Sequence, residues 1–274
     1  MRRFEEKAVL ITGGGGGIGA AAARQFASEG AQIVLLDQAL DGLAQTAAEC
    51  RERGSPQVVE YGVSQTDAAA VAEAVEEAWA ACGRIDVLFA NAGYGKLAPF
   101  LSLSAPDWNR HVEVNLTGTF HVCQEVARRM AADRGGGAIV LNASSGAAVY
   151  ADQLSAYCAT KAAVRMLAIG MASELGVHRI RVNAIMPGVI ETGMTAPMLA
   201  DERHREVLMA ETPVGRLGRP GDVASLVCFL ASAEAEYITG EAVMIDGGQT
   251  IHGHPRWFRL DYGRPHDERW EIGR

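Results

Sequence analysis

The sequence predicts a doubly wound α/β fold, in which a parallel sheet of about seven strands carries helices on both faces. Short apolar runs alternate with longer, alanine-rich amphipathic stretches along most of the chain. The apolar runs are mostly continuous rather than alternating, which is typical of strands that are covered on both faces, as in a parallel sheet. Repeated alternation of strand and helix is the pattern of a doubly wound sheet.

Each apolar run is expected to be a strand and each amphipathic stretch a helix. The strands are Ala8–Thr12, Gln32–Asp37, Val58–Val63, Asp86–Asn91, Ala138–Ala143, Arg181–Met186 and Ala242–Asp246. The helices are Ile18–Glu29, Asp41–Arg53, Asp67–Ala81, Pro106–Asp133, Ser155–Gly176 and Asp222–Ser232. No linker rich in Pro or Ser interrupts residues 1–250, so we expect one domain there. Residues 251–274 are expected to be a polar extension, either disordered or packed on the body or on a neighbouring subunit.

The composition of the 274 residues disfavours several classes of protein. Hydrophobic residues make up 49%, but no apolar run approaches the ~20 residues of a membrane helix, and no secretory signal is recognisable. We therefore expect a soluble, cytoplasmic protein. The net charge of −8 at pH 7 disfavours binding to nucleic acid or anionic lipid. The five cysteines are scattered and lack metal-site spacing, so no metal is expected.

A glycine-rich segment, Thr12–Gly19, follows the first strand and opens the first helix. Gly13, Gly16, Gly17 and Gly19 permit a tight turn, a close approach of the backbone to a pyrophosphate, and close packing of helix on strand. The free N–H groups at the helix start then face the phosphates. A glycine run alone is typical of a flexible loop, but its place between strand and helix favours a dinucleotide site.

Asp37 ends the second strand, about twenty residues after the glycines. A carboxylate there accepts hydrogen bonds from the adenosine ribose hydroxyls and repels a 2′-phosphate. Gln38 rather than an arginine follows it, and no basic residue stands among residues 14–16. These observations favour NAD over NADP, although Asp37 alone equally fits an ordinary turn at a strand end.

A second group of residues indicates acid–base chemistry. Tyr157 and Lys161 are four residues apart and share one face of an expected helix. The pKa of an ordinary tyrosine, about 10, is too high for an efficient base near neutrality, and a neighbouring cation lowers it. Ser144 ends the fifth strand, where a hydroxyl can donate to a substrate carbonyl oxygen. Each feature alone also fits a structural role, such as a surface lysine beside a half-buried tyrosine.

Together these residues resemble the short-chain dehydrogenase/reductase family in its compact form, from about residue 5 to residue 250. The motifs that carry the resemblance occur in the family's order. They are Thr12-Gly-x-x-x-Gly17-Ile18-Gly19, Asn91-Ala92-Gly93, Asn115, Ser144, Tyr157-x-x-x-Lys161, Pro187-Gly188-Val189-Ile190-Glu191-Thr192 and Gly218-Arg219-Pro220. Each motif is weak alone, but their joint occurrence is specific. The resemblance implies a Rossmann-like fold and a nicotinamide-dependent oxidoreductase.

The resemblance also implies roles for the polar residues. Tyr157 would be the general acid/base, and Lys161 would lower its pKa and bind the nicotinamide ribose. Ser144 would orient the carbonyl oxygen, with Ser145 as the alternative. Asn115 would hold a water that links Lys161 to solvent; in the sequence alone, it is equally a local cap in a long helix.

On the cofactor side, the resemblance places Asn91-Ala92-Gly93 along the adenosine, and residues 187–192 along the nicotinamide. Ile190 and Thr192 would hold the carboxamide and phosphate side of the cofactor. Many members carry Asp-Val at the end of the third strand, where the Asp contacts adenine. This chain has Gly62-Val63, so only the Val63 N–H is left for that contact.

The substrate loop is expected at residues 192–209, after Pro187-Gly188. Met194, together with Tyr150 and neighbouring apolar residues, suggests a mostly apolar pocket for a cyclic or hydrophobic secondary alcohol, diol or ketone. Family habit implies a homotetramer, built on helices 106–133 and 155–176, with a dimer as the alternative.

Two other functions remain open on the sequence. One is a nicotinamide-binding sensor or scaffold without turnover, because fold does not establish function. The presence of Asn115, Ser144, Tyr157 and Lys161 argues against it. The other is epimerisation or dehydration, whose relatives tend to have a larger C-terminal substrate domain than this chain offers.

Overall fold

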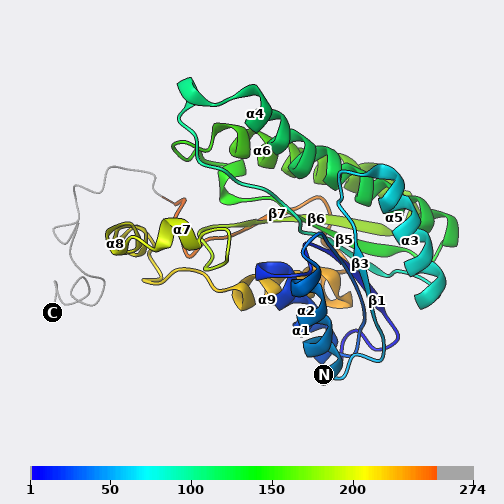
Figure 1. The fold of residues 1–274 in the computed structure, drawn as a ribbon. Coiled ribbons are helices and arrows are strands. Elements are labelled where there is room, and N and C mark those ends of the chain that lie inside the picture. The colour runs from blue at the N-terminus through cyan, green and yellow to red at the C-terminus, as the bar shows by residue number, and fades with distance from the viewer. Residues whose placement is uncertain (1, 252–274) are drawn as a thin grey trace.

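The computed structural model describes residues 2–251 and confirms the predicted doubly wound fold. The strands form one parallel sheet in the order β3-β2-β1-β4-β5-β6-β7 (Figure 1). They are β1 (Ala8–Thr12), β2 (Gln32–Asp37), β3 (Val58–Gly62), β4 (Val87–Ala90), β5 (Gly137–Asn142), β6 (Ile180–Pro187) and β7 (Ala242–Ile245). The order reverses between β1 and β4, and ligands of such sheets bind beyond the strand C-termini at this point.

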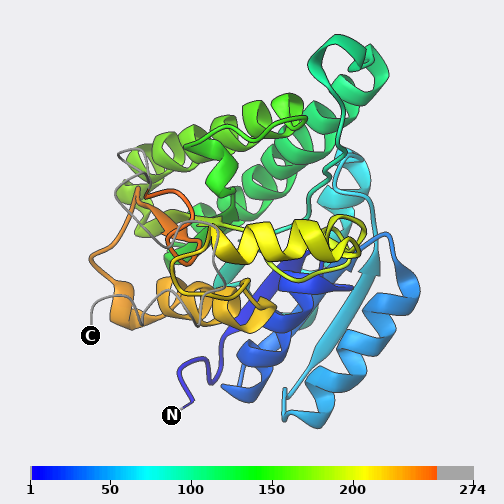
Figure 2. The same cartoon turned by 90° about the vertical axis from the view of Figure 1, so that its left-hand side faces the viewer.

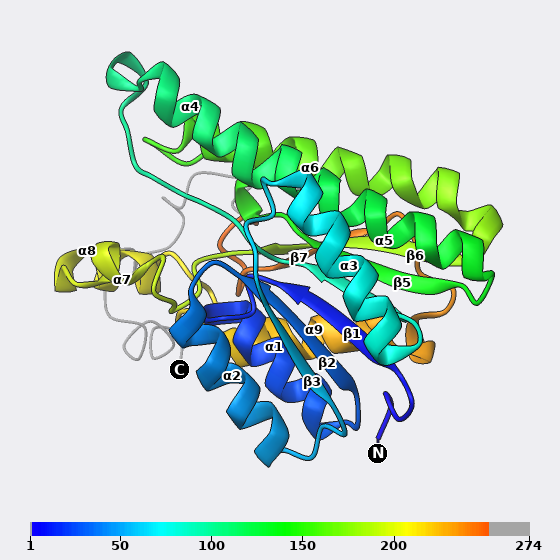
Figure 3. The same ribbon diagram turned by 45° about the vertical axis from the view of Figure 1, so that its right-hand side comes forward.

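The helices cover both faces of the sheet (Figure 3). They are α1 (Gly17–Ser28), α2 (Leu40–Glu52), α3 (Ala68–Cys82), α4 (Ala105–His111), α5 (Thr119–Asp133), α6 (Ser155–Leu175), α7 (Ala196–Leu199), α8 (Glu202–Ala210) and α9 (Pro220–Ala231). Single 3₁₀ turns lie at Phe100–Ser102, Ser145–Ala147, Gly176–His178 and Ala233–Ala235. One core lies under α1, α2 and α9, and the other under α3, α5 and α6.

The continuous apolar strands follow from these two cores. Successive side chains of a strand point to opposite faces. In β1, Val9 and Ile11 therefore enter the core under α1, while Leu10 enters the core under α6. All three are fully buried, and burial of each such side chain stabilises the fold by about 1.5–3 kcal/mol.

Two helical segments differ from the prediction. The stretch expected as one helix over Pro106–Asp133 is helical throughout but contains a π-helical turn, Val112–Gly118, between α4 and α5. The wider turn, of a kind often found at functional sites, contains Asn115. The expected substrate loop instead forms α7 and α8, where the Asp201 carboxylate accepts from Arg203 N and caps α8. Both helices lie beside the C-terminal ends of the strands (Figure 2).

Within residues 2–251, no helix is long and apolar enough to cross a membrane. Over the same range, no three Asp, Glu, His or Cys side chains cluster as a metal site would require. Residues 252–274 of the predicted extension lie outside the described residues.

Candidate active site

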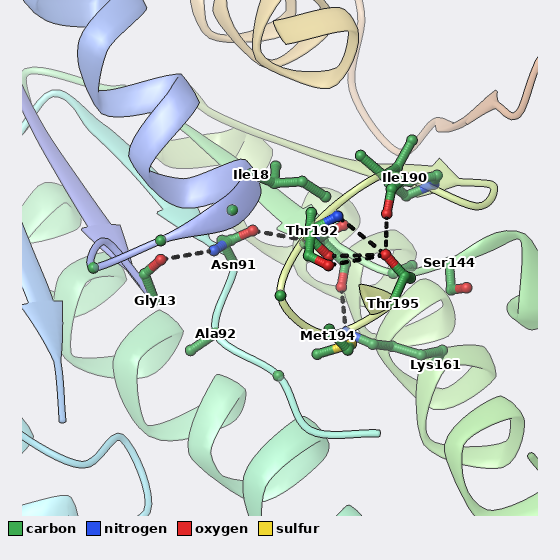
Figure 4. A pocket seen from close by; sticks show the side chains of 18 of the residues that line it. Gly13, Ile18, Asn91, Ala92, Ser144, Lys161, Ile190, Thr192, Met194 and Thr195 are labelled. Atoms are coloured by element: carbon green, nitrogen blue, oxygen red, sulfur yellow. Dashed lines mark hydrogen bonds between the residues drawn. The ribbon is translucent and has the colours of Figure 1, made fainter. Parts of the chain in front are cut away.

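A cavity of about 400 Å³, the main cavity, lies at the C-terminal ends of β1, β4, β5 and β6 (Figure 4). Its wall brings together the predicted nucleotide residues and the predicted acid–base residues. These are Gly13, Gly16, Gly17, Ile18, Asp37, Asn91, Ala92, Gly93, Ser144, Tyr157, Lys161, Pro187, Gly188, Ile190, Thr192 and Met194. Residues more than 100 positions apart in the sequence therefore share one wall.

The glycine segment forms a bare backbone cradle at one end of the main cavity. Gly13 and Gly17 have φ values of +65° and +53°, a region that disfavours side chains. A Cβ on Gly16 would meet nothing within 4 Å, so this residue faces open space. A Cβ on Gly19 would collide with the Gly13 carbonyl, so Gly19 permits close packing of α1 on the loop. The cradle fits a pyrophosphate at the N-terminus of α1.

Asp37 stands beside this cradle at the end of β2. Its Oδ2 accepts from Gly15 N at 2.9 Å, and its Oδ1 accepts from Ala39 N at 3.0 Å. These bonds hold the carboxylate on the wall of the main cavity. Among the described residues of that wall, Lys161 is the only basic side chain. The chemistry at Asp37 suits a donor such as a ribose hydroxyl rather than an anion.

Tyr157 and Ser144 meet elsewhere on the wall of the same cavity. Tyr157 lies in the first turns of α6, and Ser144 follows β5. Burial raises the pKa of the Tyr157 phenol above its ordinary value of 10, and a hydrogen bond with Ser144 opposes this rise. The Ser144 Oγ also accepts from Gly146 N at 3.1 Å, which fixes its position. Ser145 lies on the wall of a neighbouring cavity.

Lys161 is only 4% exposed, and its ammonium group faces the Tyr157 ring, with Nζ 5.7 Å from the ring centroid. Nζ donates to the Asn142 carbonyl oxygen at 2.7 Å. Burial lowers the pKa of Lys161 from 10.5 to about 8. The sequence predicted that Lys161 lowers the pKa of Tyr157. In the structure, burial has the largest effect on both groups, and it raises the pKa of Tyr157 and lowers that of Lys161.

Asn115 is fully buried in the π-helical turn and lines none of the cavities described here. Its Oδ1 accepts from Tyr94 N at 2.7 Å, and its Nδ2 donates to Tyr94 O and Thr160 Oγ1 at 2.9 and 3.1 Å. The side chain thus ties the loop after β4 to α6. A Cβ built on Gly93 would lie 3.3 Å from Lys161 Nζ and 3.4 Å from Asn115 Oδ1.

A smaller cavity of about 140 Å³, the side cavity, lies beyond Asp37. Val63 lines it as expected, but Gly62 does not. Gly62 is exposed at the end of β3, and a Cβ on it would lie 2.5 Å from Leu40 Cδ2. Gln65 and Thr66 line the cavity instead, and neither was singled out from the sequence.

A family model described as "Enoyl-(Acyl carrier protein) reductase" matches residues 14–250. The chain also superposes on a short-chain type dehydrogenase/reductase from Mycobacterium marinum, with a TM-score of 0.87 and 34% identity over 91% of this chain and 97% of that chain. The protein belongs to the short-chain dehydrogenase/reductase family. It is thus an oxidoreductase of a family that binds nicotinamide cofactors, and the predicted resemblance is confirmed.

Named relatives of this short-chain dehydrogenase/reductase act in different reactions. The chain is 40% identical to the D-threitol dehydrogenase of Mycolicibacterium smegmatis over 250 residues, which cover 91% of this chain and 95% of the relative. It is 39% identical to the 3-oxoacyl-[acyl-carrier-protein] reductase of Thermotoga maritima over 251 residues, which cover 91% and 100%.

A third cavity of about 320 Å³, the apolar cavity, adjoins Tyr157 and Ser144 in this dehydrogenase/reductase. Its wall surface is mostly apolar and includes Met194, which also lines the main cavity; Asp152 is the one charged side chain on it within the described residues. The other apolar wall residues include Leu97, Ala151, Leu154, Val189, Met198 and Leu208. Tyr150, predicted to contact substrate, is 85% exposed and lines none of the three cavities, because its side chain points to solvent.

Two residues of the site were missed in the sequence. Thr195 Oγ1 donates to Ile190 O at 2.6 Å and accepts from Thr192 N at 3.0 Å, so it pins the segment along the main cavity (Figure 4). Asn142 holds Lys161 through its carbonyl and donates from Nδ2 to Asn91 Oδ1 at 2.9 Å. The available signal was a polar side chain at the end of β5 for Asn142, and a threonine in the segment after β6 for Thr195.

The burial of Lys161 predicts a pH-dependent stability. Between the folded pKa of about 8 and the ordinary value of 10.5, the unfolded chain binds more protons than the fold, so stability rises with pH in this window. Without nucleotide, the free energy of unfolding of the wild type should gain about 3 kcal/mol relative to Lys161→Met between pH 7 and about 10.5. Denaturant titrations of both proteins across that range measure it. Lys96→Met, at an exposed lysine, should show no such gain, and a pH-independent difference for Lys161→Met would contradict the assignment.

Proposed function

We propose that the protein is an NAD-dependent dehydrogenase that interconverts a secondary alcohol and its ketone. One observation carries the proposal: the glycine cradle and Asp37 share a cavity wall with Ser144, Tyr157 and Lys161. The cradle and Asp37 would hold the phosphates and adenosine ribose of a dinucleotide, and Lys161 and Tyr157 would lie on its nicotinamide side. When bound, it supplies or accepts the hydride.

The chain's own residues then handle the proton and position the substrate. Tyr157 exchanges the proton of the substrate hydroxyl at its Oη, and Ser144 donates a hydrogen bond to the same substrate oxygen. Lys161 carries a positive charge at neutral pH, because its pKa of about 8 lies above 7. That charge favours the phenolate form of Tyr157 and opposes the effect of burial. Asn115 holds the loop and helix around Lys161 and supports a proton path to solvent.

The preference for NAD rests on Asp37. Its carboxylate is held by two backbone N–H groups at the edge of the cradle, where a ribose diol can donate to it. A 2′-phosphate at this place would face the carboxylate, and the wall of the side cavity offers it no basic side chain within the described residues.

The apolar cavity supports a cyclic or hydrophobic secondary alcohol or diol as substrate. It adjoins Tyr157 and Ser144, and its volume of about 320 Å³ suits a small molecule. Its methionines, Met194 and Met198, give an adaptable wall.

We propose a homotetramer as the working assembly. The outer surface of α5 and α6 carries a groove lined by Phe120, Leu167 and Met171. Phe120 and the nearby Met166 are 42% and 65% exposed, a composition that favours contact with a second copy. Sedimentation equilibrium that gives the mass of a single chain would exclude this assembly.

The activity is tested by incubating the protein with NAD and a panel of cyclic, hydrophobic and polyol secondary alcohols, and by following NADH. We expect turnover with NAD on at least one cyclic or hydrophobic alcohol. Measurable NADH binding without turnover on any alcohol or ketone would favour a nicotinamide-binding sensor over a dehydrogenase.

A further inference from the structure

Gln65, in the loop between β3 and α3, is 7% exposed and lies where the side cavity meets the π-helical turn. Its Nε2 donates to Val114 O at 2.8 Å and to Ala92 O at 3.2 Å. The amide orientation is fixed, because a flipped amide would set Oε1 against two carbonyl oxygens. Both amide hydrogens are therefore used to join two segments of the active site.

The buried side chain of Gln65 lowers the stability of the fold through its unpaired oxygen. Gln65 Oε1 is buried and has no hydrogen-bond partner within the described part of the chain, and an unpaired buried acceptor is destabilising. The side chain also packs closely on the π-helical turn, since a Cβ on Gly118 would lie 2.7 Å from Gln65 Cγ. An apolar side chain would fill the same space without an unpaired acceptor, so the two donated bonds are the feature that sets Gln65 apart.

The bond from Gln65 to Ala92 is one of several that fix the backbone of residues 92–94. Ala92 is fixed from both sides, because its N–H donates to Thr12 Oγ1 at 3.0 Å and its carbonyl accepts from Gln65. Two residues later, Asn115 holds both backbone groups of Tyr94. Gly93, between these clamps, faces Lys161 Nζ. The position of Gly93 along the main cavity thus depends on the side-chain amides of Gln65 and Asn115. Gln65 is also bonded to Val114, the residue that precedes Asn115.

We infer that Gln65 is a positioning residue that couples cofactor binding to the acid–base group. Through Ala92 it sets the wall along the cofactor, and through Val114 it sets the place of Asn115 in the π-helical turn. The inference rests on the proposed function, since it assigns Gln65 a role toward the nicotinamide cofactor. Through these two bonds, Gln65 links the adenosine end of the main cavity to the residues proposed to support the proton path.

Gln65→Met, which keeps the length and removes both donors, tests this. We expect the NADH dissociation constant, measured by fluorescence, to rise about tenfold and kcat to fall about tenfold, because two carbonyl oxygens beside the side cavity lose their donor. We also expect the apparent pKa of the kcat profile to shift, which a purely structural residue would not cause. Gln57→Met is the matched control, because half-buried Gln57 donates to Ala81 O at the other end of β3 and should change none of these quantities.

Gln65→Glu gives a second, independent readout. The ionised carboxylate opposes both carbonyl oxygens, whereas the protonated acid can donate to one of them. NADH affinity should therefore recover as the pH falls. The other ionisable groups that face Gln65 are His121, whose Nδ1 lies 3.2 Å from Gln65 O, and Asp37, across the side cavity. Both are present in wild type and in Gln65→Met, so comparison at each pH removes their contribution.

The outcomes separate the two proposals. If wild type itself binds no NADH, the proposed function fails. If wild type binds NADH, and Gln65→Met lowers only the melting temperature while its NADH affinity and pH profile stay within twofold of wild type, Gln65 is merely structural. If Gln65→Met does not fold, a pH-independent NADH affinity of Gln65→Glu overturns the inference in its place.

Discussion

Tyr157→Phe should lower kcat for alcohol oxidation by at least about a thousandfold, while the dissociation constant for NADH stays within a few-fold of wild type. The substitution removes the phenolic oxygen, which is the only group proposed to exchange a proton with the substrate. It leaves the ring against Lys161 and Gly146 in place. Steady-state kinetics and NADH fluorescence on the same preparations measure both quantities.

Tyr237→Phe is the matched control for this experiment. Tyr237 is fully exposed and lines no described cavity, so its loss of a hydroxyl should leave kcat unchanged. Retention of more than about a tenth of the activity in Tyr157→Phe would assign the acid–base role to another group.

Asp37→Asn should move the cofactor preference toward NADP. We expect the wild type to favour NAD over NADP in kcat/KM by at least about a hundredfold, because a 2′-phosphate would stand close to the carboxylate. Asn keeps one oxygen acceptor for the backbone and removes the charge. The ratio should fall by about tenfold or more, mostly through a lower KM for NADP.

The control for this change is Asp41→Asn, in the first turn of α2. Asp41 carries the same charge but lines neither the main nor the side cavity. Asp41→Asn therefore shows how far the loss of one surface charge changes the NAD/NADP ratio without a contact to the cofactor. An unchanged NAD/NADP ratio in Asp37→Asn would mean that Asp37 only shapes the turn, through Gly15 and Ala39.

Much of the fold follows from local sequence pattern. Every predicted strand is present and ends within one residue of its predicted bounds, because buried parallel strands leave a continuous apolar run. The π-helical turn was not predicted, since no proline or internal glycine marks a break between the helices on either side of Val112–Gly118. Its position depends on tertiary contacts such as those of Gln65 and Asn115.

The site was predictable where a residue type acts through its own chemistry in a fixed motif. Tyr157, Lys161 and the glycine segment belong to this class. Residues that act through backbone groups far away in sequence gave no such signal, as with Gln65 on Val114.

Isotope transfer tests the central claim most directly. A secondary alcohol that is a substrate is prepared with deuterium on the carbinol carbon, and the NADH formed by the protein is analysed by mass spectrometry. A dehydrogenase that moves a hydride from this carbon to the nicotinamide gives deuterated NADH in amounts equal to the ketone formed. Conversion of the alcohol without deuterium in the nicotinamide, or with its loss to solvent, would contradict the account and favour epimerisation or dehydration on the same fold.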